Sequence, residues 1–290
     1  MAKGIPPPKL DEAPLTPGLY VIATPIGNLR DITLRALDVL AAADLVLAED
    51  TRVAAKLLQA YGLSAKLERY DEHGAERTRP KAMAALADGK TVALVSDAGT
   101  PLVSDPGYKL VREAAAEGYP VYPIPGASAL LAGLSAAGLP TDRFLFAGFP
   151  PPKSAARRTF LEELAPVRAT LVFFEGGSRL AASLADMAAV LGGGREAVVC
   201  RELTKLYETF YRGPLTDLAA DPRLDAPKGE IVILVGPGRE TEATAGDVDT
   251  ALADALQRLR PADAAAEVAK ALGLSRREVY QRAMQLRAGK

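Results

Sequence analysis

The sequence is poor in the residues from which metal and redox centres are built. Its 290 residues include one cysteine, one histidine and no tryptophan. A single cysteine excludes an internal disulfide and any multi-cysteine metal site, and a single histidine leaves a histidine-cluster site without ligands. Cys200 follows the apolar residues 197–199, where a buried structural thiol is favoured over a nucleophile. We therefore expect no metal site.

Long hydrophobic runs and an excess of one charge are also missing. No stretch approaches the roughly 18 apolar residues of a membrane span, and residues 1–14 lack the apolar core of a secretory signal. We expect a cytoplasmic protein with no membrane partner. Because the formal net charge is −1, binding to a nucleic acid must come from a local basic patch.

What is present is the alternation of an α/β protein. Residues 1–17 contain five prolines and predict a flexible leader. Over residues 18–149, short apolar runs alternate with amphipathic segments, which predicts an N-terminal lobe with a mainly parallel sheet covered on both faces. Its expected strands are 19–23, 45–48, 91–95 and 121–124. Residues 144–149 either continue this sheet or leave it.

The three prolines at 150–152 mark the expected start of a second α/β lobe, residues 150–238. Closely spaced strands in this lobe predict a mixed or antiparallel sheet. The strands are expected at 170–174, 196–200, 207–211 and 231–235, with helices near 155–164 and 178–191. Residues 239–290 predict a polar linker to about residue 250, then helices around a turn at Gly273, as in a helix-turn-helix.

Two glycine-containing loops follow strands of the first lobe, Ser96–Pro101 and Pro125–Ser128. In an open α/β sheet, ligands bind beyond the carboxyl ends of the strands, where such loops gather. Neither loop is a GxGxxG or GxxxxGK[ST] motif, so a nicotinamide or nucleoside-triphosphate site lacks sequence support. The pattern alone leaves open that both loops are ordinary turns. Asp50 or Thr51, Asp105 and Ser128 are the expected helix caps.

Five motifs occur in order along the chain: TPIGNL at 24–29, AEDTR at 48–52, SDAGTP at 96–101, SDPG at 104–107 and PGAS at 125–128. Together with Gly148-Phe149, Lys153 and Lys228-Gly229-Glu230, they resemble the ribosomal RNA small-subunit methyltransferase I group of the tetrapyrrole methylase superfamily. The resemblance covers roughly residues 18–238, and the final helices are similar to the small C-terminal domain of many members.

The resemblance implies two α/β lobes with S-adenosylmethionine in the cleft between them, usually in a homodimer. It implies 2′-O-methylation of a cytidine in the decoding region of 16S rRNA, within the small ribosomal subunit. The cofactor contacts that it implies are Pro25, Ser96, Asp97, Ala98, Gly99, Asp105, Ala127, Ser128, Gly229 and Glu230. One motif departs from the group: Glu175-Gly176-Gly177-Ser178-Arg179 stands where members often have Glu-Ser/Ala-Pro-His-Arg, so no role of that histidine is carried over.

A ribose hydroxyl is a poor nucleophile while protonated, so a nearby base should help the transfer. Asp50, Glu49 and His73 are the candidates, with Asp50 and His73 favoured as catalytic residues. Asp50 with Arg52 is equally typical of a helix cap with a surface ion pair. His73, in a polar loop, is equally typical of a solvated histidine, and positioning alone can suffice.

Basic clusters supply the candidate RNA contacts. Their members are Arg52, Lys153, Arg157, Arg158, Arg276, Arg277 and Arg282. Residues 276–290 hold five basic residues against one acidic residue, which favours an RNA-contacting accessory domain; DNA recognition is not inferred. Solvated helix faces explain such clusters as well. Two other functions stay open: a methylase acting on a precorrin-type tetrapyrrole, and a non-catalytic RNA-binding assembly factor.

Overall fold

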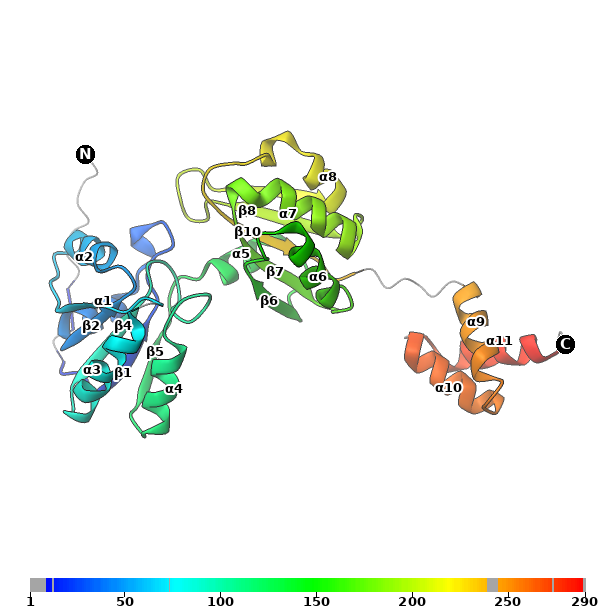
Figure 1. The fold of residues 1–290 in the computed structure, drawn as a ribbon, viewed down its shortest axis with the longest axis horizontal. Helices are drawn as coiled ribbons and strands as arrows, with labels where there is room; N and C mark the ends of the chain where they lie inside the picture. Colours follow the sequence, from blue (N-terminus) through cyan, green and yellow to red (C-terminus); the bar gives the residue numbers. More distant parts are fainter. Residues whose placement is uncertain (1–8, 12, 73, 239–244, 273, 289–290) are drawn as a thin grey trace. The chain divides into compact units, whose positions relative to one another are not determined.

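The computed structural model describes residues 9–11, 13–72, 74–238, 245–272 and 274–288. It divides into two compact units, residues 1–238 and 239–290 (Figure 1). His73 and Gly273, two residues singled out from the sequence, lie outside the described residues. Within the described part, no helix is long and apolar enough to cross a bilayer.

The first lobe is built on a five-stranded sheet in the order β3-β2-β4-β1-β5, and every neighbouring pair is parallel. Its strands are β1 (Gly18–Ile22), β2 (Leu45–Ala48), β3 (Leu67–Arg69), β4 (Thr91–Val95) and β5 (Val121–Ile124). The parallel sheet is therefore confirmed. The edge strand β3 and the helix after it are additions that the sequence pattern did not predict.

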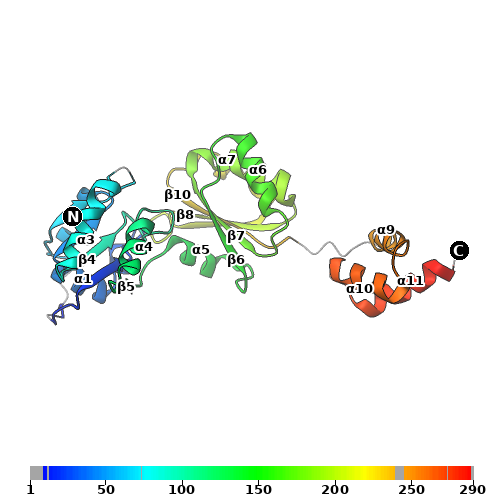
Figure 2. The ribbon, with the colours of Figure 1, turned by 60° about the horizontal axis from the view of Figure 1, so that its bottom comes forward.

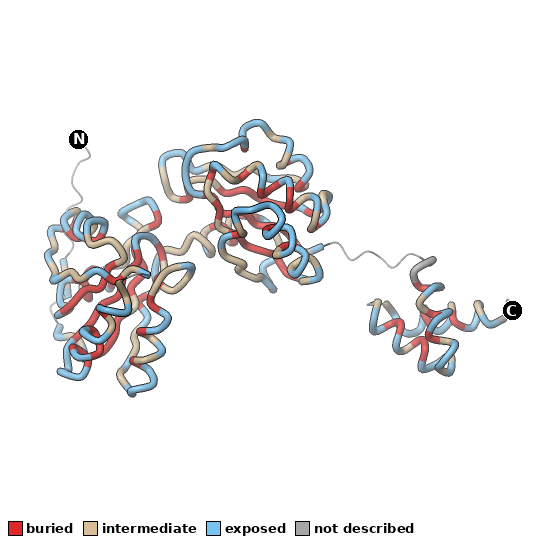
Figure 3. The backbone as a smooth tube through the Cα atoms, viewed as in Figure 1, coloured by how far each residue is buried: buried red, intermediate tan, exposed pale blue. Residues whose placement is uncertain are grey.

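Alternate residues of these strands face two helical layers, because successive side chains of a strand point to opposite faces. The helices are α1 (Leu34–Ala42), α2 (Thr51–Ala60), α3 (Ala75–Ala87) and α4 (Tyr108–Ala116). Val92 and Leu94 pack in one cluster with residues of α3 and α4, whereas Ala93 and Val95 pack with residues of α1 and α2. Figures 2 and 3 show these helices around the buried sheet.

The second lobe holds a mixed sheet in the order β6-β7-β10-β8-β9, in which only β6 and β7 run parallel. Its strands are β6 (Phe144–Gly148), β7 (Thr170–Gly176), β8 (Glu196–Arg201), β9 (Thr209–Pro214) and β10 (Glu230–Val235). Residues 144–148 thus leave the first sheet and join the second. The lobe limits expected from the sequence stay predictions, although the chain changes sheets before the triple proline.

One face of the second sheet packs against α6 (Ser154–Leu164), α7 (Leu180–Met187) and α8 (Leu215–Ala220). The expected helix 178–191 is divided into a 3-10 turn (Gly177–Arg179), α7 and a π-turn (Ala188–Gly192). The other face packs against α5 (Ala129–Ala137) and Ile26 of the first lobe. That shared cluster joins the lobes.

Two of the three polar side chains expected to cap helices do so, and the third does not. Asp50 caps α2 by accepting a hydrogen bond from the Arg52 N–H at 2.8 Å, and Ser128 caps α5. Asp105 is not a cap, contrary to the expectation: α4 begins at Tyr108, with Gly107 at its N-cap at φ +131°. That backbone conformation is typical of glycine. Because Gly107 and not Asp105 is the N-cap residue, the Asp105 carboxylate makes no cap hydrogen bond and is available for other contacts.

The C-terminal unit contains α9 (Ala245–Ala255), α10 (Pro261–Leu272) and α11 (Arg276–Ala288). These helices enclose a small core that includes Leu252, Val268 and Val279. The expected linker to residue 250 is wrong from residue 245 onward, because α9 begins there. Residues 239–244 lie outside the described part.

Candidate functional site

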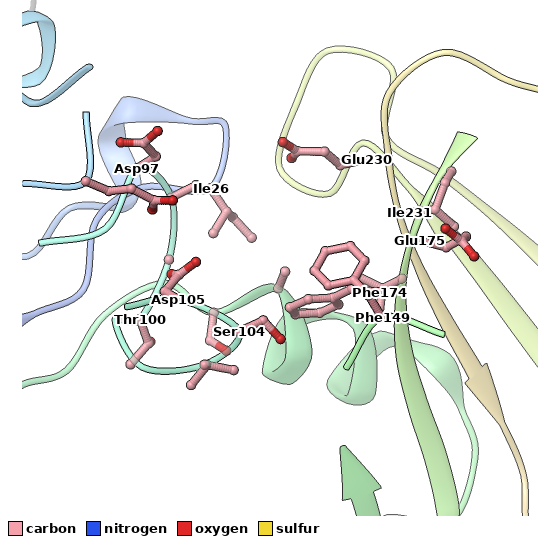
Figure 4. A pocket seen from close by; sticks show the side chains of 17 residues that line it. Ile26, Asp97, Thr100, Ser104, Asp105, Phe149, Phe174, Glu175, Glu230 and Ile231 are labelled. Carbon is pink, nitrogen blue, oxygen red and sulfur yellow. The ribbon is translucent and has the colours of Figure 1, made fainter. Parts of the chain in front are cut away.

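A cavity of about 280 Å³ lies between the two lobes of the first unit. This volume is near the lower end of the range for small-molecule sites, about 300–1,000 Å³. Figure 4 shows Asp97, Asp105 and Ile26 facing Phe149, Phe174 and Glu230 across it. The remaining lining residues are Glu49, Ala98, Gly99, Thr100, Val103, Ser104, Ser128, Ala129, Glu175, Ile231 and Val232. We call it the inter-lobe pocket.

The first-lobe wall consists of residues that follow β1, β2, β4 and β5. Thr24 and Gly99 exchange backbone hydrogen bonds of 2.8 and 3.0 Å, and the Thr24 hydroxyl donates to the Ser96 carbonyl at 3.1 Å. Gly99 has φ +83°, and Ile26 packs against it closely. A side chain at position 99 would therefore be strained and crowded, which explains the glycine.

Three carboxylates project from this wall: Glu49, Asp97 and Asp105. Burial raises the pKa of Asp105 to about 6, with further increases from the charges of Glu49 and Asp97 and a decrease from hydrogen bonding to Ser96. Burial and then the charge of Asp97 also raise the pKa of Glu49. Among the described residues lining the pocket, none is lysine, arginine or histidine, so these three carboxylates have no basic side chain beside them in the lining.

The second-lobe wall is mostly apolar. Phe149 and Phe174 lie edge to face, with ring centroids 5.6 Å apart, and Val232 lies beside them in the lining. Glu175 reaches the lining too, but its carboxylate pairs with Arg179 at 2.5 Å and accepts from the Ser183 hydroxyl at 2.6 Å. Its charge is therefore neutralised within the second lobe.

The altered motif after β7 has a local explanation. Gly177 is buried, and a Cβ atom there would overlap the carbonyl oxygen of Pro227. Any side chain at this position would push the Pro227 segment away. Glu175 and Arg179, which this chain keeps from the usual motif, form the ion pair just described.

Ion pairs and a hydrogen bond beside the pocket hold the loop between β8 and β9 in place and connect the two lobes. Lys205 bridges Glu202 at 2.9 Å and Glu230 at 3.0 Å. The Asn28 N–H donates to the Thr204 hydroxyl at 3.2 Å. The loop between β8 and β9 is thereby tied both to the first lobe and to a pocket residue.

The expected cofactor contacts divide into two sets. Those lining the pocket are Asp97, Ala98, Gly99, Asp105, Ser128 and Glu230. Pro25, Ser96, Ala127 and Gly229 do not line it, but each precedes or follows a lining residue in the chain. Two of them also support the wall: Ala127 accepts a hydrogen bond from the lining Thr100 hydroxyl at 3.1 Å, and the Ser96 hydroxyl donates within its own loop.

Of the two favoured catalytic candidates, Asp50 is not among the residues that line the pocket. Asp50 caps α2 and pairs with Arg52 at 2.5 Å, and these hydrogen bonds hold its pKa well below its ordinary value. A carboxylate that holds protons so weakly is a poor base near neutral pH. His73 lies outside the described residues. Glu49, the third candidate, does line the pocket.

Arg157 was expected to contact RNA, but the structure buries its side chain. Its side chain is 3% exposed and pairs with Asp186 at 2.7 Å. It also donates to the carbonyls of Pro151 and Pro152 at 3.3 and 3.2 Å. Arg157 therefore connects the triple proline to α7, and its buried guanidinium group is not available to bind a phosphate.

The other candidates stay at the surface. Lys153, Arg158, Arg276 and Arg277 are exposed. Arg52 is 85% exposed although paired with Asp50. Arg282 pairs with Asp249 at 2.5 Å, so its charge is largely compensated.

Sequence reasoning assigned no role to the aromatic wall. Phe149 stood in a motif of the resemblance, and Phe174 stood in a predicted strand, but apolar side chains of this kind usually signal core packing. The one signal in the sequence was that Phe149 immediately precedes a proline run. In the structure Phe149 is 54% exposed and lines the pocket.

An apolar recess with three carboxylates on one wall, and no basic side chain in its described lining, suits an organic cation with flat, apolar parts. The carboxylates supply attraction to the positive charge, and the two phenylalanine rings supply an apolar surface. Among the residues described, no group of three or more His, Cys, Asp or Glu side chains is arranged to hold a metal ion. The lining of the pocket thus suits a cationic small molecule.

Comparison with known families gives two matches along the chain. Residues 18–219 match the model of the Tetrapyrrole (Corrin/Porphyrin) Methylases. Residues 242–287 match the model described as the RsmI C-terminal HTH domain.

Individual relatives agree with these matches. A protein of Mesorhizobium japonicum named ribosomal RNA small subunit methyltransferase I is 52% identical over 275 residues, covering 94% of each chain. Its namesake from Escherichia coli O157:H7 is 44% identical, over 92% of this chain and 94% of that protein. The crystal structure of the methyltransferase CobJ has a TM-score of 0.58 at 20% identity, over 76% of this chain and 94% of that one. This last likeness concerns the fold alone.

Proposed function

Since this chain belongs to the ribosomal RNA small subunit methyltransferase I family, we propose that it transfers a methyl group from S-adenosylmethionine to the 2′-hydroxyl of a cytidine in the decoding region of 16S rRNA. The observation that carries the proposal is the inter-lobe pocket, with carboxylates on one wall and phenylalanines on the other. The chain is an S-adenosylmethionine-dependent methyltransferase by family, and the pocket is where we place the donor.

The pocket residues fit that donor. S-adenosylmethionine carries a sulfonium and an ammonium group, both cations, beside a flat adenine. Glu49, Asp97 and Asp105 offer the negative charge, and Phe149 and Phe174 offer apolar faces. When bound, the donor supplies a methyl group that is already activated, so the protein has mainly to position the acceptor and manage its proton.

We propose that Asp105 is the base that accepts the proton of the ribose hydroxyl. Its carboxylate lines the pocket and is not used as a helix cap. A pKa of about 6 leaves it mostly ionised at neutral pH, yet able to accept a proton from a ribose hydroxyl as that oxygen bonds to carbon. Glu49 and Asp97 contribute by raising that pKa. Asp50, held ionised by Arg52, is not assigned this role.

The function is tested by incubating the full chain with methyl-labelled donor and, separately, isolated small ribosomal subunits and a uroporphyrinogen-type tetrapyrrole. We expect label only in 16S rRNA, in a nucleoside that mass spectrometry identifies as 2′-O-methylcytidine. Labelled tetrapyrrole with unlabelled RNA would replace the proposal by a tetrapyrrole methylase. Donor binding without transfer to any subunit or precursor particle would indicate a non-catalytic assembly factor.

We also propose that the protein acts as a homodimer in the cytoplasm, where its ribosomal substrate is. Several large apolar side chains on the first unit are exposed, among them Leu131 at 55%, Leu206 at 87% and Tyr207 at 66%. Such exposure is typical of interaction surfaces. Light scattering of the purified chain should give twice the monomer mass of 30.4 kDa; a monomer at all concentrations would rule the dimer out.

A further inference from the structure

The C-terminal unit has a recess of its own, with a volume of about 570 Å³. It lies where the end of α9, the start of α10 and the end of α11 meet. Three arginines and three leucines among its lining residues define what we call the arginine groove: Arg258, Arg260, Arg287, Leu256, Leu259 and Leu286. No acidic residue is among the described residues that line it.

Two of these arginines have no ion-pair partner among the residues that the structure describes. Arg258 pairs with Glu267 at 2.6 Å and with Asp254 at 3.8 Å. In the described part of the chain, by contrast, neither Arg260 nor Arg287 has an ion-pair partner, and both are exposed. The groove therefore combines two guanidinium groups that have no ion-pair partner among the described residues with three leucine side chains.

The opposite end of α11 is different. Of the three arginines that the sequence singled out there, Arg282 is compensated by Asp249, while Arg276 and Arg277 are exposed and line neither the inter-lobe pocket nor the arginine groove. The groove, by contrast, brings arginines and leucines together around one recess, and this combination points to the groove as a site for a specific group.

We propose that the arginine groove binds an unpaired nucleotide of RNA, with its phosphate at Arg260 and Arg287 and its base or ribose against the leucines. The proposal rests on the proposed function, because it takes the RNA substrate from there. Guanidinium groups bind phosphate oxygens with two hydrogen bonds at once, which a lysine cannot do. Unpaired bases, whose faces are accessible, pack on apolar and arginine surfaces, whereas paired bases are hidden in a helix.

The test measures binding of the full chain to a fluorescent oligocytidylate of about 12 nucleotides over a series of salt concentrations. Each lost phosphate contact lowers the slope of log K against log salt by about 0.7 for single strands. We therefore expect the slope of Arg260→Ala/Arg287→Ala to fall by about 1.4, and its affinity at low salt by about tenfold. Lys270→Ala, an exposed cation on α10 outside the groove, should change neither.

Two further measurements fix the interpretation. Arg260→Lys/Arg287→Lys should keep the slope, because the charges remain, but bind more weakly. The same strand paired with its complement should bind wild-type protein and the alanine variant alike. The proposal is overturned if the alanine variant binds the single strand as Lys270→Ala does.

Failure here is distinguishable from failure of the proposed function. Donor binding by calorimetry and labelled methyl transfer to small subunits are measured on the same wild-type preparation. If wild type binds the donor and methylates rRNA, but the groove variant binds RNA normally, the groove proposal alone is wrong. If wild type neither binds the donor nor transfers methyl, the proposed function is wrong whatever the groove does.

Discussion

The two recesses of this protein have opposite charges. The inter-lobe pocket exposes Glu49, Asp97 and Asp105 without a cation among its described lining residues. The arginine groove exposes Arg260 and Arg287 without an anion in its described lining. A net charge of −1 for the whole chain conceals this separation. The comparison teaches that charge should be counted site by site, because a donor that is a cation and an acceptor that is a polyanion require opposite surroundings.

The largest expected effect concerns the base in the acidic pocket. Asp105→Asn should lower kcat by about 10²- to 10⁴-fold, the usual contribution of a general base, and should also weaken donor binding, because it removes one of the three carboxylates that line the pocket. In wild type, kcat/KM for the donor should fall as the pH drops through about 6, because protonation of Asp105, whose pKa in the donor-free protein is raised to about 6, removes the base. Rates measured over a series of donor concentrations and pH values check both statements.

Asp50→Asn is the matched control for that experiment. Asparagine caps helices as well as aspartate does, so the variant removes the charge of Asp50 and keeps the cap on α2. We expect nearly wild-type kcat. Loss of activity in Asp50→Asn, with Asp105→Asn active, would restore Asp50 as the catalytic candidate.

A second contrast separates structural arginines from those of the groove. Arg157→Ala should lower the free energy of unfolding by about 3–5 kcal/mol, because it leaves Asp186 charged, partly buried and without its main partner. Its salt slope for RNA binding should be unchanged. Arg260→Ala should do the reverse, with stability retained and the slope reduced. Urea unfolding and the salt series measure both quantities; a reduced slope in Arg157→Ala would contradict the assignment.

The smallest expected effect comes from the aromatic wall. Phe149→Ala should weaken donor binding by about tenfold or less, since an aromatic contact contributes about 0.5–1.5 kcal/mol beyond its buried area. Phe144→Ala removes a ring of similar exposure, 44% against 54%, that does not line the pocket, and should leave the Kd unchanged. Equal Kd values for the two variants would remove Phe149 from the donor site.

Much of the fold could be predicted because its central strands are short, continuous apolar runs. β2 and β4, for example, are buried along their whole length. The edge strand β3 is only partly buried and includes Glu68 and Arg69. The helix α3 contains Pro80, which breaks the usual helical pattern. Neither therefore had a pattern that distinguished it from a loop.

The site could be predicted only in part, for a different reason. The loops at 96–101 and 125–128 were predicted because motif and strand end coincide. The roles of Asp105 and Arg157 depended on facts that local sequence does not contain. Asp105 became available because Gly107 begins the helix instead, and Arg157 became buried because Asp186, 29 residues away, is its partner. Contacts of this kind are set by tertiary packing.

The most direct test of the account is a calorimetric titration of S-adenosylmethionine into the full chain and into Ala98→Trp. Ala98 is exposed and lines the inter-lobe pocket, so an indole there should fill the space without disturbing the core. Ala41→Trp, at an exposed position of α1 away from the pocket, is the control. We predict that wild type and Ala41→Trp bind the donor with equal Kd and that Ala98→Trp does not bind it. Unchanged binding by a folded Ala98→Trp would show that the donor does not occupy this pocket.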